Sequence, residues 1–475
     1  MDFFDAIDYH FSWRFGVICR KIILISGLIW VANRKTQILW DKLMKFYSTT
    51  SILALAMTAG LSVPTIAQDA GDEVQSVYEK YRPDFSAPGA RTGSFLFYPT
   101  IEGSVKYDSN IYKARAGVTQ SNAGEIDDFI FQIKPGFNLT SDWNQNAFSF
   151  YADADIAKYG DNSGEDYEDF NVGANGRIDV SRGTFINYGA SYSDKHEDRG
   201  SPDTTTNAAE QTVYESFKAN VGFVRDLSLV SLAVDGNYEK LDFDDVALNS
   251  GGTLNNDDRD RERWAGSVRL GYEVDQYYET FVKFSANRVE YDDSQEDGGP
   301  QRNSDGWEVV AGAAFDITGT SQGEIFGGYV KQNYDSDSLE GVDDFTFGAS
   351  LLWSPTGLTS VRTSVSRSVT ETTLTEVINT VNTPAAGILG TLFNLQLEHE
   401  LQRNVLLKGT ATYTRQDFKN INRADDLFNA SLGARYLLNR NFAVDATYTF
   451  DARDTTVALQ DYKSHIFMVS LRSQW

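Results

Sequence analysis

The chain is 475 residues long and carries a formal net charge of −25, with 41% hydrophobic and 13% aromatic residues. This acidic balance argues against nucleic acid as a partner, because no basic surface is available to displace counterions from phosphate. The single cysteine, Cys19, excludes a disulfide framework and a thiolate metal site. The hydrophobic content is low for apolar membrane helices, but it suffices for strands in which only alternate residues are apolar.

The first predicted element is an export signal at residues 44–67. Met44 is followed by Lys45, by an apolar run over 52–63 and by small residues before the expected cleavage site near Ala67. This order is typical of a secretory signal peptide, so we expect export from the cytoplasm.

Residues 1–43 precede that signal and are interpreted as an upstream extension of the reading frame, with Met44 as the physiological start. The alternative is a long or membrane-anchored leader that begins at Met1. The apolar run at 22–32 is shorter than the roughly 20 residues that a helix needs to cross a bilayer. Downstream, residues 68–93 are polar and interrupted by proline, and we predict a periplasmic tail whose composition favours disorder over entry into a pore.

From Ser94 onward the sequence alternates between apolar and polar residues. In the first such run, Phe97 and Val105 fall on one face, and Glu102 and Lys106 fall on the other. This period of two is typical of β-strands. We count eighteen runs, at 94–108, 127–141, 146–160, 166–181, 183–196, 211–225, 228–243, 260–275, 277–293, 304–318, 321–336, 343–354, 357–371, 388–400, 403–418, 425–438, 441–454 and 462–475.

The connections between these runs alternate in length. Short turns such as 226–227 and 354–356 are followed by long polar loops such as 197–210, 244–259 and 372–387. Outer-membrane barrels show this asymmetry, with short periplasmic turns and long exterior loops.

Residues 94–475 are therefore predicted to form an all-β domain, a transmembrane antiparallel up-and-down β-barrel of about 18 strands, with 16 as the alternative. A barrel of this size can enclose an aqueous channel. We expect it in the cell outer membrane, in contact with lipid and lipopolysaccharide. Which solute it passes, and its oligomeric state, are left open by the sequence.

The last strand ends the sequence on an aromatic residue. Phe467, Val469, Leu471 and Trp475 share one face. This segment resembles the terminal strand of bacterial outer-membrane barrels, and the resemblance implies a signal for the barrel-insertion machinery. We expect the last strand to pair with the strand that begins at Ser94.

Charged residues recur on the polar faces of the strands. They cannot face lipid, because a charge at the bilayer midplane costs roughly 2–4 kcal/mol, so we predict that they line the pore. Both signs are mixed, and no strong ion preference follows. The predicted pore-lining residues are Lys106, Lys134, Asp153, Asp155, Arg177, Asp179, Lys218, Asp235, Arg269, Glu273, Arg362, Lys408, Arg435 and Asp445.

No enzymatic constellation is expected. The chain has four histidines, and none lies at a metal-ligand spacing. His465 beside Ser464 or Ser470 is the one arrangement that could suit catalysis, but a serine-rich wall supplies such neighbours by chance. The aspartate-rich loops lack the spacing of an EF-hand. We therefore predict no catalytic residue, no metal and no cofactor.

A short motif follows the first strand, where Tyr107, Asp108, Asn110, Ile111 and Tyr112 match the pattern Y-D-x-N-I-[YF]. With the barrel pattern over 94–475, it resembles bacterial outer-membrane proteins of the beta-barrel porin 2 type. Some members of that family supply the outer-membrane pore for a periplasmic polysaccharide-export protein. The resemblance therefore implies a pore for hydrophilic solutes that takes part in exopolysaccharide export. A diffusion porin for small solutes, and an outer-membrane enzyme or adhesin that uses the acidic loops, are the alternatives.

Overall fold

The computed structural model describes residues 75–116, 124–205, 207–292, 299–317, 320–378 and 381–475, which belong to one compact unit. The expectations for 1–43 and 44–67, and the first part of the predicted tail, lie outside these residues. Among the described residues, no helix has the length and apolar composition needed to span a bilayer.

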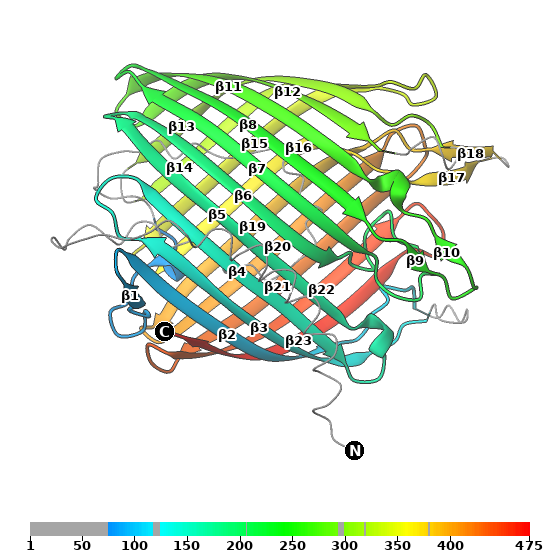
Figure 1. The fold of residues 1–475 in the computed structure, drawn as a ribbon, viewed down its shortest axis with the longest axis horizontal. Helices are drawn as coiled ribbons and strands as arrows, with labels where there is room; N and C mark the ends of the chain where they lie inside the picture. The colour runs from blue at the N-terminus through cyan, green and yellow to red at the C-terminus, as the bar shows by residue number, and fades with distance from the viewer. Residues whose placement is uncertain (1–74, 117–123, 206, 293–298, 318–319, 379–380) are drawn as a thin grey trace. The chain divides into compact units, whose positions relative to one another are not determined.

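Eighteen of the described strands form a closed antiparallel wall (Figure 1). The main sheet has 19 strands, and β1 (Ala90–Thr92) pairs only with β2, so 19 − 1 = 18 strands remain. Every strand end agrees with the predicted runs to within two residues. The wall strands are β2 (Phe95–Asp108), β3 (Asp128–Ser141), β4 (Ala147–Tyr159), β5 (Tyr167–Ser181), β6 (Thr184–His196), β7 (Val213–Asp226), β8 (Val230–Phe243), β11 (Arg261–Asp275), β12 (Tyr278–Tyr291), β13 (Ser304–Ile317), β14 (Ser321–Tyr334), β15 (Val342–Thr356), β16 (Thr359–Thr370), β19 (Ile388–Gln402), β20 (Val405–Phe418), β21 (Ala424–Leu437), β22 (Phe442–Thr455) and β23 (Tyr462–Gln474).

The last strand closes the barrel against the first, as predicted. Tyr107 lies opposite Phe467, and Val105 lies opposite Val469. The backbone N–H of Trp475 donates a hydrogen bond of 3.2 Å to the carbonyl of Pro99. Closure leaves no free sheet edge, so the backbone groups of each strand find partners within the wall.

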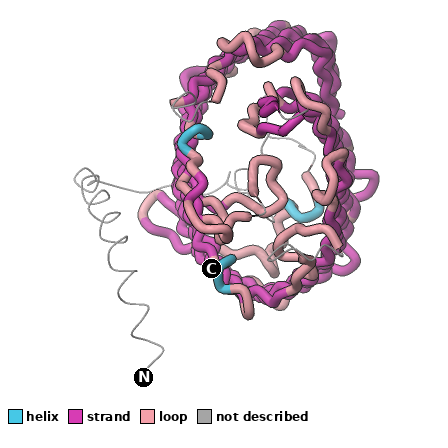
Figure 2. Tube along the Cα trace, turned by 90° about the vertical axis from the view of Figure 1, so that its right-hand side faces the viewer, coloured by secondary structure: helices cyan, strands magenta, loops and turns pink. Residues whose placement is uncertain are grey.

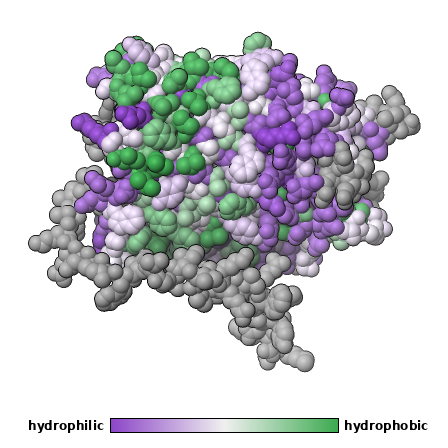
Figure 3. Space-filling view, turned by 45° about the horizontal axis from the view of Figure 1, so that its top comes forward, coloured by the Kyte–Doolittle hydropathy of each residue, from purple (hydrophilic) through white to green (hydrophobic). Residues whose placement is uncertain are grey.

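The outer face of the wall carries the apolar row of each strand. Large apolar side chains such as Val105, Phe131, Leu270 and Phe467 are exposed there. On the face in view, Figure 3 shows a hydrophobic area over the strands, bordered by hydrophilic residues at the end with long connections. A closed wall with an apolar exterior can reside in lipid, because no unpaired backbone group faces the hydrocarbon.

The two ends of the barrel differ in their connections. At the end that we call the turn end, strands are joined by short turns; Gly183, with φ of +69°, makes the left-handed step between β5 and β6. At the opposite end, the loop end, longer connections carry small elements of their own. These are η2 (Ser163–Glu165), η3 (Asp257–Arg259) and the two hairpins β9 (Val246–Ala247) with β10 (Thr253–Leu254) and β17 (Thr375–Ile378) with β18 (Val381–Pro384).

Candidate functional site in the barrel lumen

The cross-strand register assigns the other row of each strand to the inner face. Directly opposed residues of an antiparallel pair project to the same side of the sheet. Arg435 lies opposite Asp445, Asp445 opposite Ser470, and Ser470 opposite Ser104. Followed around the wall, this register puts all the residues predicted to line the pore on the inner face: Lys106, Lys134, Asp153, Asp155, Arg177, Asp179, Lys218, Asp235, Arg269, Glu273, Arg362, Lys408, Arg435 and Asp445.

Many of these charges are paired across neighbouring strands. Lys134 lies 2.8 Å from Asp155, and Arg435 lies 2.6 Å from Asp445. On another part of the wall, Arg269 contacts Glu279 at 2.7 Å. The sequence analysis predicted mixed charge, but it did not predict which groups meet, because pairing depends on register. The inner face is therefore hydrophilic, and ion pairs within the wall neutralise part of its charge.

Residues 75–89, which we call the tail segment, lie against this inner face at the turn end. The N–H of Val77 donates to Ser360 Oγ at 2.8 Å, and the N–H of Tyr78 donates to Glu398 Oε2 at 2.9 Å. The side chain of Val77 is 0% exposed. The expectation of a disordered tail was therefore wrong for these residues, since specific contacts with the wall hold them in place.

The conformation of the tail segment is also supported from within. Its 3-10 helix η1 (Val77–Glu79) is capped by Glu79 Oε2, which accepts a hydrogen bond of 3.0 Å from the N–H of Ser76. Arg82 donates to the carbonyl of Val77 at 2.9 Å and pairs with Glu400 at 2.7 Å. These contacts give the segment one defined shape on the wall.

The tail segment follows the wall over several strands. Near its start, the carbonyl of Gln75 accepts from Ser354 Oγ on β15, and further along, the carbonyl of Phe85 accepts from Gln474 Nε2 on β23. It therefore narrows the opening at the turn end along the wall formed by β15 to β23.

Tyr78 is the central side chain of this contact. Lys408 Nζ and the guanidinium of Arg435 lie 5.7 Å and 5.2 Å from the centre of its ring. Burial raises the pKa of Tyr78 to about 12, Asp445 and Glu398 act in the same direction, and Arg435 opposes them. The phenol therefore stays neutral at physiological pH. It faces the two cations as an uncharged aromatic ring.

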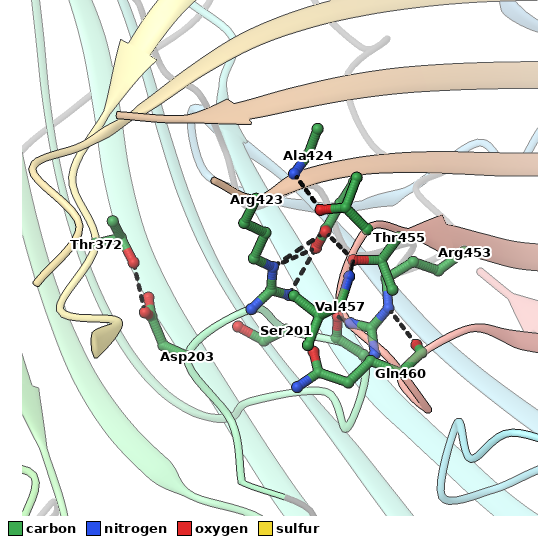
Figure 4. Close-up of polar contacts among 12 residues, drawn as sticks. Ser201, Asp203, Thr372, Arg423, Ala424, Arg453, Thr455, Val457 and Gln460 are labelled. Carbon is green, nitrogen blue, oxygen red and sulfur yellow. Dashed lines mark hydrogen bonds and ion pairs between the residues drawn. The ribbon is translucent and has the colours of Figure 1, made fainter. Parts of the chain in front are cut away.

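At the loop end, loops that are distant in sequence are tied together (Figure 4). Arg302 donates to the carbonyls of Thr372 and Ala385, both at 2.8 Å. The hydroxyl of Thr372 donates to Asp203 at 2.6 Å, as Figure 4 shows. Arg453 Nη1 donates to the carbonyl of Gly200 at 3.2 Å. Figure 2 shows loop segments inside the ring of strands. The opening at this end is therefore narrowed by loops as well.

Buried ion pairs reinforce these loops. Arg259 contacts Glu197 at 2.7 Å, and Arg199 donates through Nε to Glu165 at 2.9 Å. All four side chains are largely buried. The sequence analysis did not single out these residues, since a charged loop sequence alone is typical of a solvated surface.

The motif that follows β2 forms a turn across the closing seam of the barrel. The side-chain amide of Asn110 donates to the carbonyl of Lys463 at 2.9 Å, and Ser464 donates to Asp108. Lys113 lies 3.5 Å from both Asp108 and Asp451. Burial alone would lower the pKa of Lys113, but the surrounding aspartates outweigh it and raise the pKa. The motif Tyr107, Asp108, Asn110, Ile111 and Tyr112 thus contributes contacts between the first and last strands.

The one arrangement considered for catalysis is not assembled. His465 falls on the outer face, where its Nδ1 lies 2.9 Å from the hydroxyl of Tyr448. Ser464 and Ser470 fall on the inner face. Within the described ranges, no group of three or more metal-ligating side chains comes together.

The closed 18-stranded wall, its apolar exterior and its hydrophilic interior define an outer-membrane β-barrel of the porin class. Its family follows from comparison with known sequences. The chain belongs to the family described as "Putative beta-barrel porin 2", which matches residues 82–475. No match was found among curated proteins.

Several solved structures match this chain at low similarity. The siderophore receptor PirA from Acinetobacter baumannii is 6% identical with a TM-score of 0.42, over 79% of this chain and 80% of that chain. The alcaligin outer membrane receptor FauA from Bordetella pertussis is 12% identical with a TM-score of 0.36, over 81% and 77%. Similarity this low carries no information about the solute.

Proposed function

We propose that the protein is an outer-membrane pore through which a hydrophilic polymer, an exopolysaccharide, leaves the cell. The observation that carries this proposal is the inner face. Neighbouring strands present partly exposed side chains with hydroxyl groups, such as Thr447 and Thr449, beside paired charges, such as Arg435 with Asp445. Such a surface offers many hydrogen bonds, and it can exchange contacts with a hydroxyl-rich chain as that chain moves.

The rest of the proposal concerns the route and the partners of the protein. Export follows cleavage near Ala67, and insertion uses the last strand with Phe467, Val469, Leu471 and Trp475. In outer-membrane barrels the short turns face the periplasm, so a periplasmic polysaccharide-export protein would meet the turn end, where the tail segment lies.

Deletion of the gene tests this proposal. We expect the deletion strain to lose secreted polysaccharide and to regain it with the intact gene. A strain whose secretion is unchanged would contradict the proposal. Growth on small sugars should not depend on the gene.

A second candidate is a diffusion pore for small solutes. It is favoured by the contacts of Arg302 and Asp203 at the loop end, because these contacts narrow the opening through which a long polymer would have to pass. Vesicle swelling separates the two functions. Rapid entry of monosaccharides together with normal polysaccharide secretion in the deletion strain would favour the second candidate.

A further inference from the structure

The wall beneath the tail segment carries cations that the wall itself does not neutralise. Arg362 pairs with Glu79 of the tail segment at 3.3 Å, and no other ion pair of Arg362 occurs among the described residues. Among the described residues, Lys408 likewise forms no ion pair, and its ammonium group faces the ring of Tyr78. By contrast, Lys134 and Arg435 have carboxylates of the wall as partners. Arg362 therefore depends on the tail segment for its anionic partner, and Lys408, which lies opposite Glu398 on the wall, directs its ammonium group toward the ring of Tyr78.

The same surface carries hydrogen-bonding groups that the tail segment satisfies. Ser360 Oγ donates to Glu398 Oε2 at 3.2 Å, and each also accepts a backbone N–H from the tail segment. Ser360 and Glu398 are almost fully buried beneath the segment. A buried polar group that loses its partner costs about 1–3 kcal/mol, so release of the segment requires water or a ligand to replace it.

We define the tail seat as Ser360, Arg362, Glu398, Lys408 and Arg435. Its present occupant combines two chemical features. Tyr78 supplies a flat six-membered ring whose hydroxyl donates to the carbonyl of Leu406 at 3.4 Å, and Glu79 supplies a carboxylate to Arg362. A sugar ring that carries a carboxylate combines hydroxyl groups and an anion in one unit, and it would meet Lys408 and Arg435 through its hydroxyl groups rather than through an aromatic face.

We propose that the tail seat binds a carboxylated sugar unit of the exported polymer, and that the tail segment occupies this site until the polymer displaces it. This inference rests on the proposed export function and specifies its substrate class. The carboxylate of the sugar pairs with Arg362, in place of Glu79. Its hydroxyl groups accept from Lys408 and donate to Glu398. A neutral sugar would leave Arg362 without an anionic partner.

Labelling of a thiol at position 76 tests the displacement. Ser76 is 3% exposed, and the one cysteine of the chain, Cys19, can be replaced by serine, so the Ser76→Cys variant carries a single protected thiol. The labelling rate by a maleimide is measured on the full chain in detergent, with oligogalacturonate or with a maltooligosaccharide of equal length. We expect oligogalacturonate to raise the rate about fivefold, the factor that corresponds to one partly exposed ion pair. The maltooligosaccharide should leave it unchanged.

Variants of the tail seat distinguish recognition of the carboxylated sugar from a general weakening of the contacts that hold the tail segment on the wall. Arg362→Gln should raise the basal labelling rate, because Glu79 loses its partner, and should abolish the response to oligogalacturonate. Lys408→Gln should weaken the response and serves as the second variant. Lys218→Gln is the matched control, because Lys218 is an inner-face cation on β7 that pairs with Glu239, away from the tail seat. It should retain the full response.

Two results would overturn the inference: an equal response to both oligosaccharides, or a full response in Arg362→Gln. Neither outcome depends on secretion. If the deletion strain loses secreted polysaccharide while the tail seat does not discriminate, the export function stands and this inference fails. If oligogalacturonate displaces the tail segment while secretion is normal in the deletion strain, the export function fails instead.

Discussion

The two ends of the barrel are narrowed by different kinds of contact. At the loop end, loops distant in sequence are joined by arginines that are almost fully buried, such as Arg302 and Arg259. At the turn end, one linear segment lies along the wall, held by a partly exposed ion pair between Glu79 and Arg362 and by a less exposed pair between Arg82 and Glu400. Breaking a buried charge contact costs about 3–5 kcal/mol, whereas an exposed pair contributes about 0–1 kcal/mol. We infer that the loop end persists while the turn end can open.

The largest expected effect follows from replacing Arg302. Arg302→Met removes the hydrogen bonds to the carbonyls of Thr372 and Ala385 and leaves those carbonyls without a charged donor. We expect a loss of about 3–6 kcal/mol in the stability of the loop over 371–387, because two hydrogen bonds from a charged donor are lost, each of about 1.5–3 kcal/mol. Protease cleavage within this loop measures the effect. Arg288→Met, which removes more exposed ion pairs, is the control and should change cleavage little.

The buried pair of Arg259 and Glu197 gives the next largest effect. Arg259→Met leaves the carboxylate of Glu197 buried without its ionic partner, and we expect a loss of about 3 kcal/mol in the free energy of unfolding. The double variant Arg259→Met with Glu197→Leu should recover much of it, because the uncompensated charge is gone. Thermal unfolding in detergent provides the measurement, and strictly additive losses would contradict the role of the pair.

A smaller effect is expected at the turn end. Arg82→Gln removes the ion pair with Glu400 and should cost about 1–2 kcal/mol, because charged hydrogen bonds of this strength hold the tail segment on the wall. Bilayer recordings should then show larger or longer conductance steps than the unaltered protein. Arg91→Gln, which removes the exposed pair with Asp142, should leave the recordings unchanged. Unchanged steps in both variants would argue against a releasable tail.

The smallest expected effect is a pH dependence at the loop end. Burial raises the pKa of Asp260 to about 6; neighbouring aspartates add to this shift, and a hydrogen bond from the N–H of Phe243 opposes it. A carboxyl with a raised pKa contributes stability below its unfolded pKa of about 3.9, and this contribution is lost as the pH rises through about 6.

Hydrogen exchange over 244–260 should therefore be slower at pH 4.5 than at pH 7.5, after correction for intrinsic exchange. Asp260→Asn should remove this difference, because the side chain is neutral at both pH values. Asp305→Asn, which alters an exposed carboxylate, should retain it. A pH dependence that survives Asp260→Asn would exclude Asp260 as its origin.

The strands could be predicted from the sequence because their signal is local. Alternation with a period of two and the turn residues between runs act over a few neighbouring positions, and all 18 strands were located in this way. Alternation also assigned Lys134, Asp155 and the other predicted pore-lining residues to one side of their strands. Their part in transport remains a prediction.

The tail segment could not be predicted, because its partners are distant. Val77 and Ser360 are separated by 283 positions, and Tyr78 and Glu398 by 320. The composition of a segment describes that segment alone and not the distant residues that contact it. Judged by composition, a polar stretch with prolines is typical of disorder. These partners lie within contact distance in the folded barrel, although they are far apart along the chain.

The motif after β2 could be predicted only in part. Its sequence indicated a turn and a family resemblance, and both are found. That Asn110 bonds to Lys463, 353 positions away, became visible only in the structure. The sequence by itself determined the alternation and the positions of the strands, and it predicted the pairing of the last strand with the first, whereas the structure decided between 18 and 16 strands. Tertiary structure decided which charged side chains form ion pairs and which segments narrow the opening at each end of the barrel. Those contacts depend on strand register and barrel closure rather than on neighbouring residues.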